Sequence, residues 1–285
     1  MLKKIKKTAV LSLSIISTLQ MFIPETVFAF FRWIPCIFAL NCKRISKSTA
    51  DTVNILISRI VLFIAIWLGI IIIYSIYLNC RKKVVIKNRS YKIQIEYGDI
   101  FKTDHCKRVI NFDECFTTKV GSAPADINPN SVCGKYLHMN PELNMKELIR
   151  AANVKPAKKK SKHCGNVRYK SGTIVPNGDD LLLAFARLDK VGKGRFFSRD
   201  EYLECLSILW KEIENHYGQN DVCITVLGGG TTSFDGGSGE SISAQELLDT
   251  IIHSYILSSH KIKLPYKLRI ICRREDDISL KDIEI

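Results

Sequence analysis

The sequence predicts an α/β domain with a largely parallel or mixed central sheet, preceded by two helices that cross a membrane. Three observations support this prediction. From Tyr91 onward, segments with the alternating pattern of strands are interleaved with segments that have the spacing of helices. Before them, residues 53–78 form an apolar run that contains a single charged side chain. Finally, a strand pattern at 222–227 leads directly into Gly228-Gly229-Gly230, a loop type that can hold phosphate groups.

The membrane region is expected to cover residues 1–80, and its second helix to span about 55–78. Arg59 is the only charged residue between Val53 and Leu78, and the apolar residues lie all round the predicted helix. About 20 such residues suffice to cross about 30 Å of hydrocarbon. A helix buried in a soluble protein would show a polar side, so we expect this segment to span a membrane.

The first helix is expected within about 9–40, where a proline and two charged residues interrupt an apolar stretch. Two interpretations stay open. Four lysines precede the stretch, and residues 27–29 could serve as a cleavage site, as in a signal peptide. The apolar residues continue to Leu40, however, as they would in an uncleaved helix. We expect the uncleaved helix, and therefore a two-helix transmembrane hairpin in a multi-pass protein.

The positive charge of the chain is concentrated beside the predicted membrane region. The net charge is +14 and the pI is near 9.3. Residues 1–90 hold 14 basic and 2 acidic side chains, whereas 91–285 hold 28 and 26. Nucleic acid is therefore not an expected partner. The basic residues before the first helix, and those in the expected juxtamembrane linker 81–90, place the C-terminal domain in the cytoplasm.

One basic cluster remains in the domain, at 155–163, where five lysines lie close together. Such a cluster could contact anionic lipid or another polyanion. A solvated loop insert has the same composition, and we expect this second interpretation.

Metal binding is not predicted by the cysteine and histidine spacing. None of the ten cysteines forms a Cys-x-x-Cys pair, and the six histidines show no ligand spacing. Cys205 and Cys223 lie in a helical and a strand pattern, where free thiols pack as small hydrophobic groups in a reducing cytoplasm. We expect no metal and no cofactor.

The domain from Tyr91 is about 195 residues long, enough for one sizeable core. Two capping boxes mark helix starts, Ser198 with Glu201 and Ser243 with Glu246. The expected elements are, in order, strands at 91–97, 108–112 and 181–188, a helix at 197–217, a strand at 222–227, a helix after Ser243 and a strand at 266–272.

The glycine triplet offers backbone N–H groups to a ligand. Without a Cβ atom, residues 228–230 can adopt positive φ and bring their N–H groups near a diphosphate, while Thr231, Thr232 and Ser233 add further donors. A flexible turn would have the same composition. Phe234 could stack on a sugar or base, or anchor the loop in the core.

Asp99 and Ile100 come just after the first strand of the domain and could recognise adenine. The Asp99 carboxylate could accept a hydrogen bond from the exocyclic amine of adenine while the Ile100 N–H donates to a ring nitrogen. The alternative is an aspartate that caps a turn. In an α/β sheet such a position, beyond the carboxyl end of a strand, is where ligands bind.

The order of these motifs resembles the macro domain, an ADP-ribose-binding α/β/α module. The resemblance covers about Tyr91 to Cys272 and rests on Gly98-Asp99-Ile100, on Val109-Ile110-Asn111 before a long polar loop, and on Ile-Thr-Val-Leu-Gly-Gly-Gly-Thr-Thr-Ser-Phe at 224–234. With two membrane helices in front, the whole chain resembles the membrane-anchored macro-domain effectors of Thoeris antiphage systems. Residues 111–121 and Ser131-Val-Cys-Gly134 are similar to two elements of that group.

This resemblance implies a three-layer α/β/α sandwich with a mixed central sheet. It further implies an inner-membrane effector that binds a nucleotide signal made from NAD by a TIR-domain enzyme, namely histidine joined to ADP-ribose. Binding would drive homo-oligomerisation and disruption of the lipid membrane. The expected ligand-binding residues are Asp99, Ile100, Asn111, Thr117, Val120, Gly121, Ser131, Gly228, Gly229, Gly230, Thr231, Thr232, Ser233 and Phe234.

The sequence departs from macro domains that hydrolyse ADP-ribose linkages. Those domains usually carry an Asn-Ala-Ala-Asn run followed by an early glycine triplet, and here Asn111-Phe112-Asp113-Glu114 stands in its place without a triplet after it. We therefore expect a non-catalytic effector. A membrane-bound ADP-ribosyl hydrolase and a membrane scaffold without a ligand are the alternatives.

Overall fold

The computed structural model describes residues 10, 13–15, 17–18, 47–123, 125–196, 198–230, 232–234, 242–281 and 283. The chain divides into two compact units, residues 1–81 and 82–285. The first membrane helix, expected within about 9–40, lies almost entirely outside the described residues.

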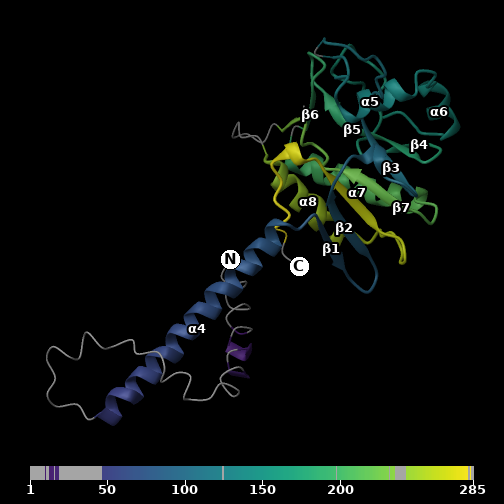
Figure 1. Ribbon diagram of the computed structural model, residues 1–285. Helices are drawn as coiled ribbons and strands as arrows, with labels where there is room; N and C mark the ends of the chain where they lie inside the picture. Colours follow the sequence, from purple (N-terminus) through teal and green to yellow (C-terminus); the bar gives the residue numbers. More distant parts are fainter. Residues whose placement is uncertain are drawn as a thin grey trace. The chain divides into compact units, whose positions relative to one another are not determined.

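The first unit contains a long apolar helix, α4 (Lys47–Asn79), labelled in Figure 1. Its segment Ile55–Leu78 has 24 residues, which corresponds to about 36 Å at 1.5 Å per residue and exceeds the thickness of a bilayer core. Isoleucines stand exposed along it, with Ile72 at 58% and Ile73 at 69%. Among the described residues it is the one helix that meets the requirements of a membrane span. The expected two-helix hairpin and multi-pass topology are thus corrected to one long apolar helix in this part of the chain.

The second unit begins with a strand where the sequence suggested a linker. β1 (Lys83–Lys87) pairs antiparallel with β2 (Lys92–Tyr97), and Val84 is fully buried. The basic residues of 81–90 are therefore partly built into the sheet edge.

The described residues form a nine-stranded mixed sheet in the order β1-β2-β9-β7-β3-β5-β6-β8, with β4 on β5. Its centre is parallel, because β2, β9, β7, β3 and β5 all run the same way. β1 runs antiparallel to β2, β4 and β6 run antiparallel to β5, and β8 is parallel to β6. The remaining bounds are β3 (Cys106–Asp113), β4 (Ile174–Asn177), β5 (Asp180–Leu188), β6 (Gly194–Phe196), β7 (Asp221–Thr225), β8 (Ser233–Phe234) and β9 (Leu268–Cys272).

Helices cover both faces of this sheet, as the alternation along β5 shows. Leu183 and Phe185 belong to the core formed with α7 (Arg199–His216) and α8 (Ala244–Leu257). Leu182 and Ala184 belong to the core formed with α5 (Val132–Met139) and α6 (Met145–Ala151). Since successive strand residues point to opposite faces, the domain has three layers, as predicted.

The two predicted capping serines are confirmed. Ser198 Oγ accepts a hydrogen bond from Glu201 N at 3.1 Å at the start of α7, and Ser243 Oγ accepts one from Glu246 N at 3.2 Å at the start of α8. Each bond satisfies an N–H group that the first helical turn leaves unpaired.

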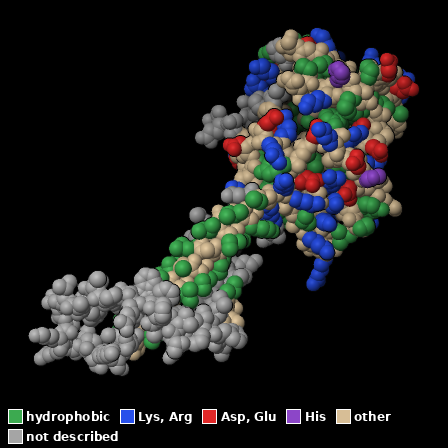
Figure 2. All heavy atoms as spheres, viewed as in Figure 1, with side chains coloured by type: hydrophobic (Ala, Val, Ile, Leu, Met, Phe, Trp, Pro, Cys, Tyr) green, Lys and Arg blue, Asp and Glu red, His purple; other side chains and the backbone are tan. Residues whose placement is uncertain are grey.

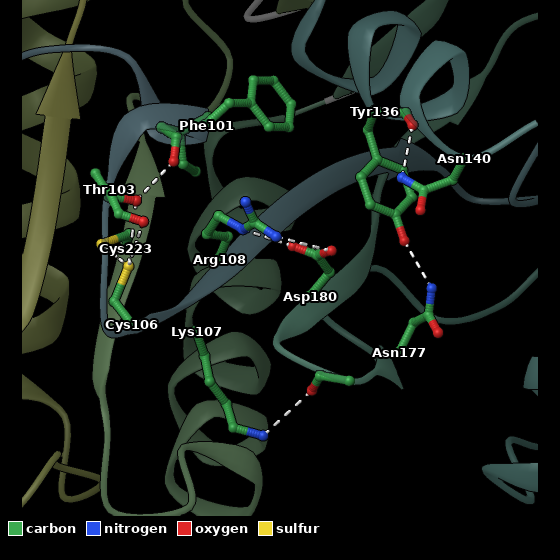
Figure 3. A network of polar contacts seen from close by, with 12 residues as sticks. Phe101, Thr103, Cys106, Lys107, Arg108, Tyr136, Asn140, Asn177, Asp180 and Cys223 are labelled. Atoms are coloured by element: carbon green, nitrogen blue, oxygen red, sulfur yellow. Dashed lines mark hydrogen bonds and ion pairs between the residues drawn. The ribbon is translucent and has the colours of Figure 1, made fainter.

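A polar network joins the amino ends of β3 and β5, opposite the edge at which the parallel strands end (Figure 3). Arg108 Nε lies 2.8 Å from Asp180 Oδ1, linking the two strands. Asn177 Nδ2 donates to the hydroxyl of Tyr136 at 2.8 Å. Tyr136 is fully buried and lies on α5. This network therefore fixes α5 against the sheet.

On the face of the domain seen in Figure 2, basic and acidic side chains are interspersed. The pattern agrees with the nearly balanced counts of 28 basic and 26 acidic residues in 91–285. A face of mixed sign differs from the continuous basic groove that holds a nucleic-acid backbone.

Candidate functional site

A cavity of about 830 Å³ lies at the carboxyl edge of the parallel strands. It is lined by the end of β3, by residues between 121 and 133, by the end of β5, by the turn residues 192–194 and by Thr232. Its volume falls in the range of small-molecule sites, about 300–1,000 Å³. Of the predicted site residues, it brings together Asn111, Gly121, Ser131 and Thr232.

Asp113 ends β3 and shapes the loop that follows. Its Oδ1 accepts hydrogen bonds from Cys115 N at 2.7 Å and Thr117 N at 3.3 Å. Burial raises the pKa of Asp113 above its ordinary value, although these hydrogen bonds oppose the shift. Thr117 thus supports the loop from outside the cavity, and its predicted ligand contact stays a prediction.

The loop from Lys119 to Ile127 closes on itself beside the cavity. Ile127 N donates to Lys119 O at 2.9 Å, and Gly121 N donates to Ile127 O at 3.1 Å. Asp126 pairs with Lys119 at 3.0 Å. A Cβ atom on Gly121 would lie 2.3 Å from Asp126 Oδ2, so a larger residue there would displace the Asp126 carboxylate from its place in the loop. Val120 is 41% exposed and does not line the cavity.

The start of α5 faces the cavity through Ser131 and Cys133. Ser131 Oγ accepts from Gly134 N at 3.0 Å and donates to Asn128 O at 2.7 Å. A Cβ atom on Gly134 would lie 2.2 Å from Asn128 O. The Ser-x-x-Gly spacing therefore has a physical reason: the serine caps the helix and the glycine lets the preceding loop pack against it. The positive end of the helix dipole then favours an anion in the cavity.

The β5–β6 turn forms another wall. Asp189 Oδ1 accepts from Val191 N and Lys193 N, both at 2.9 Å. Gly192 has φ +92, and a Cβ atom there would lie 2.4 Å from the Cβ of Ala125. The turn thus closes tightly against the loop that follows β3.

Glu114 anchors the lysine-rich segment 155–163 beside this site. Glu114 is 1% exposed and accepts hydrogen bonds from Ser161 Oγ at 2.5 Å, Arg168 Nη1 at 3.1 Å and Leu188 N at 3.2 Å. The segment is a loop insert, as expected, and its lysine side chains are exposed. Its base is fixed to the end of β5 through a buried carboxylate.

The glycine triplet adjoins β7 but does not line the cavity. Of its three members only Gly228 has a positive φ, at +93. The positive φ that the absence of a Cβ atom permits at all three positions is thus used at one of them. A Cβ atom on Gly230 would meet no atom of the described residues within 4 Å. Thr231 lies outside the described residues, and the side chains of Ser233 and Phe234 do as well, although these two form β8.

Asp99 and Ile100 also lie outside the cavity lining. Asp99 Oδ1 accepts from Phe101 N at 3.0 Å and caps a short 3₁₀ helix, η1 (Ile100–Lys102). Ile100 is 2% exposed. The capping interpretation of Asp99 is therefore observed, and adenine recognition by these residues stays a prediction.

Sequence reasoning missed the β5–β6 turn and its Lys193 as part of the site. The turn itself was recognisable, since the strand pattern that ends at Leu188 is followed directly by Asp189 and then by Gly192. The contact of this turn with Ala125, more than 60 residues earlier in the chain, could not be recognised from the sequence. Among the described residues, no group of three or more histidine, cysteine or acidic side chains could hold a metal ion.

The profile of the family described as Thoeris protein ThsA, Macro domain, matches residues 93–273. Thoeris protein ThsA of Bacillus amyloliquefaciens (strain Y2) is 26% identical over 229 residues, which cover 76% of this chain and 74% of that protein.

Two solved structures of the Oceanobacillus iheyensis macrodomain are also similar. A mutant of it with ADPR has a TM-score of 0.44 and 12% identity, over 68% of this chain and 92% of that one. The macrodomain with ADP has a TM-score of 0.41 and 10% identity, over 68% and 90%.

Proposed function

Because the chain belongs to the Thoeris ThsA macro-domain family, whose profile matches residues 93–273, we propose that its domain binds an ADP-ribose derivative as the effector of a Thoeris antiphage system. The signal is proposed to be made from NAD by a TIR-domain enzyme, with histidine-ADP-ribose as the specific ligand.

The order of groups along one edge of the sheet carries this proposal. β2, β9, β7, β3 and β5 are parallel neighbours in this order, so their carboxyl ends meet at the same edge. Asp99 follows β2, the glycine triplet follows β7, and Asn111, near the carboxyl end of β3, lines the cavity. Adenine, diphosphate and distal ribose follow one another in the same order in ADP-ribose.

The dimensions fit a ligand of this kind. Three strand spacings of about 4.8 Å separate β2 from β3, or ~14 Å in all. An adenine at Asp99 would then leave the diphosphate near residues 228–230 and the start of α5, where N–H groups and the helix dipole favour anions. The distal ribose and any group attached to it would enter the 830 Å³ cavity.

The output is proposed to require a membrane. Residues 55–78 of α4 would anchor the chain in the plasma membrane with the domain in the cytoplasm. Ligand binding can drive homo-oligomerisation only if the associated form binds the ligand more tightly. The segment 117–140, which contains α5, supplies part of the cavity wall, and it is the surface proposed to change when the ligand binds.

We propose binding without catalysis, and one observation favours the alternative of an ADP-ribosyl hydrolase. Asp113 lines the cavity and burial raises its pKa, a property that general acids and bases share. Its Oδ1, however, is occupied by two backbone N–H groups of the loop. Incubation with ADP-ribosylated protein separates the two functions, because the hydrolase would release ADP-ribose and the sensor would not.

Calorimetry on the detergent-solubilised chain tests the binding function. ADP-ribose and histidine-ADP-ribose should give saturable heats, and Asp99→Ala should weaken both about ten- to a hundredfold if the carboxylate bonds adenine. Equal affinity in Asp99→Ala would restrict Asp99 to its capping role. If neither nucleotide gives a binding heat, the alternative of a membrane scaffold without a ligand is favoured.

A further inference from the structure

One cation lines the cavity among the described residues, and it is Lys193. Two carboxylates, Asp113 and Asp126, line the same cavity. A nucleotide with a diphosphate carries negative charge, so the distribution of these three groups bears directly on which ligands the cavity accepts.

Both carboxylates already have partners in the protein. Asp113 accepts from the backbone N–H groups of the loop that follows it. Asp126 pairs with Lys119 at 3.0 Å and accepts from Ala123 N at 3.3 Å. These bonds hold the loop 113–126 in place. Neither carboxylate needs a ligand to satisfy it.

Lys193 differs from them, because its ammonium forms no ion pair or hydrogen bond with any residue that the structure describes. Only its backbone is engaged: Lys193 N donates to Asp189 Oδ1 at 2.9 Å, and Asp189 N donates to Lys193 O at 3.0 Å. Asp189 is held in turn by Arg195 at 2.8 Å. The backbone of Lys193 is therefore held in place, while its ammonium is available to contact a ligand.

The neighbouring turn residue strengthens this arrangement. Gly192 packs so closely on Ala125 that any side chain there would collide with it. The turn is thus held against the loop that follows β3, and Lys193, the next residue of the turn, lines the cavity. Lys190, on the same turn, does not line the cavity.

We propose that Lys193 binds an oxyanion of the nucleotide and selects ligands that place negative charge at the β5–β6 turn. This inference rests on the proposed function, since it assumes that a nucleotide occupies the cavity. Two parts of such a ligand could supply the oxyanion: the diphosphate, or a carboxylate on the group attached to the distal ribose. A lysine is suited to either, because its ammonium donates in any direction from a flexible stem.

The test compares Lys193→Ala, Lys193→Arg and Lys193→Glu with the parent chain, and uses Lys190→Ala as the matched control. Affinity is measured by calorimetry for adenosine, ADP-ribose and histidine-ADP-ribose. Loss of one charged contact at a partly exposed site should weaken binding about tenfold. Lys193→Glu should lose more than Lys193→Ala, and Lys193→Arg should lose less. The loss should shrink as salt rises, because the contact is screened.

The ligands distinguish the two sources of the oxyanion. A loss of affinity with ADP-ribose in Lys193→Ala assigns the contact to the diphosphate. A loss with histidine-ADP-ribose alone assigns it to the terminal carboxylate. Adenosine, which has neither group, and the Lys190→Ala control should bind as in the parent.

Two further outcomes separate this inference from the proposed function. If the parent binds neither charged nucleotide, the proposed function fails and Lys193 has no ligand to bind. If the parent binds them and Lys193→Ala, with an unchanged melting temperature, binds them equally well, the proposed function stands and the role of Lys193 is refuted.

Discussion

Glu114 is the buried carboxylate on which the wall of the cavity and the lysine-rich insert both depend. Glu114→Ala removes the acceptor of three hydrogen bonds, from Ser161, Arg168 and Leu188. It also leaves the guanidinium of Arg168, whose side chain is 17% exposed, without its carboxylate. Breaking a buried ion pair from one side costs about 3–5 kcal/mol, because the remaining charge is no longer compensated.

For a domain of about 200 residues, each kcal/mol corresponds to roughly 2–4 °C in melting temperature. Glu114→Ala should therefore melt ~10 °C below the parent, measured by circular dichroism on the detergent-solubilised chain. Glu114→Gln keeps one carbonyl acceptor and should lose less. The double variant Glu114→Ala with Arg168→Ala should lose less than the sum of the single changes, because it leaves no stranded charge.

Glu204→Ala is the control, since Glu204 pairs with Lys170 on the surface, where both side chains are more than half exposed. An exposed pair of this kind contributes less than about 1 kcal/mol. A melting temperature for Glu114→Ala within 2 °C of that control would refute the anchoring role. Additive losses in the double variant would show that Glu114 and Arg168 do not act as a pair.

Two other predictions concern the ligand site. Gly230→Asp should leave the fold intact, because a Cβ atom there meets no atom of the described residues within 4 Å, and it should weaken ADP-ribose binding at least tenfold by like-charge repulsion. Gly230→Ser is the uncharged control, and calorimetry showing equal affinity for Gly230→Asp would contradict a phosphate contact. Asp113→Asn should match or exceed the parent in stability at neutral pH. Since burial raises the pKa of Asp113 in the native state, the parent loses stability as pH rises above the unfolded-state pKa of about 3.9, and the two proteins should converge below about pH 4. Melting curves across pH that show Asp113→Asn to be the less stable protein at neutral pH would mean that the charged carboxylate is stabilised there.

The features that the sequence predicted correctly are local ones. The caps at Ser198 and Ser243 involve residues three apart, and the buried strands β5 and β7 are runs of apolar side chains. β1 was read as a linker because lysines begin and end a strand of only five residues. Its assignment depends on pairing with β2, which no single segment reveals.

The candidate site was less predictable because its walls come from distant parts of the chain. The contact of Gly192 with Ala125 and the bond of Ser161 to Glu114 join loops that have no periodic pattern. The glycine triplet could be recognised from composition alone. The sequence does not reveal which of the three glycines has a positive φ, since that depends on how the loop leaves β7.

A crystal structure of the domain with ADP-ribose tests the central claim most directly. The account predicts adenine beside Asp99, the diphosphate between residues 228–230 and the start of α5, and the distal ribose in the cavity near Asn111. Density for the nucleotide elsewhere on the domain, with this cavity empty at saturating ligand, would contradict it.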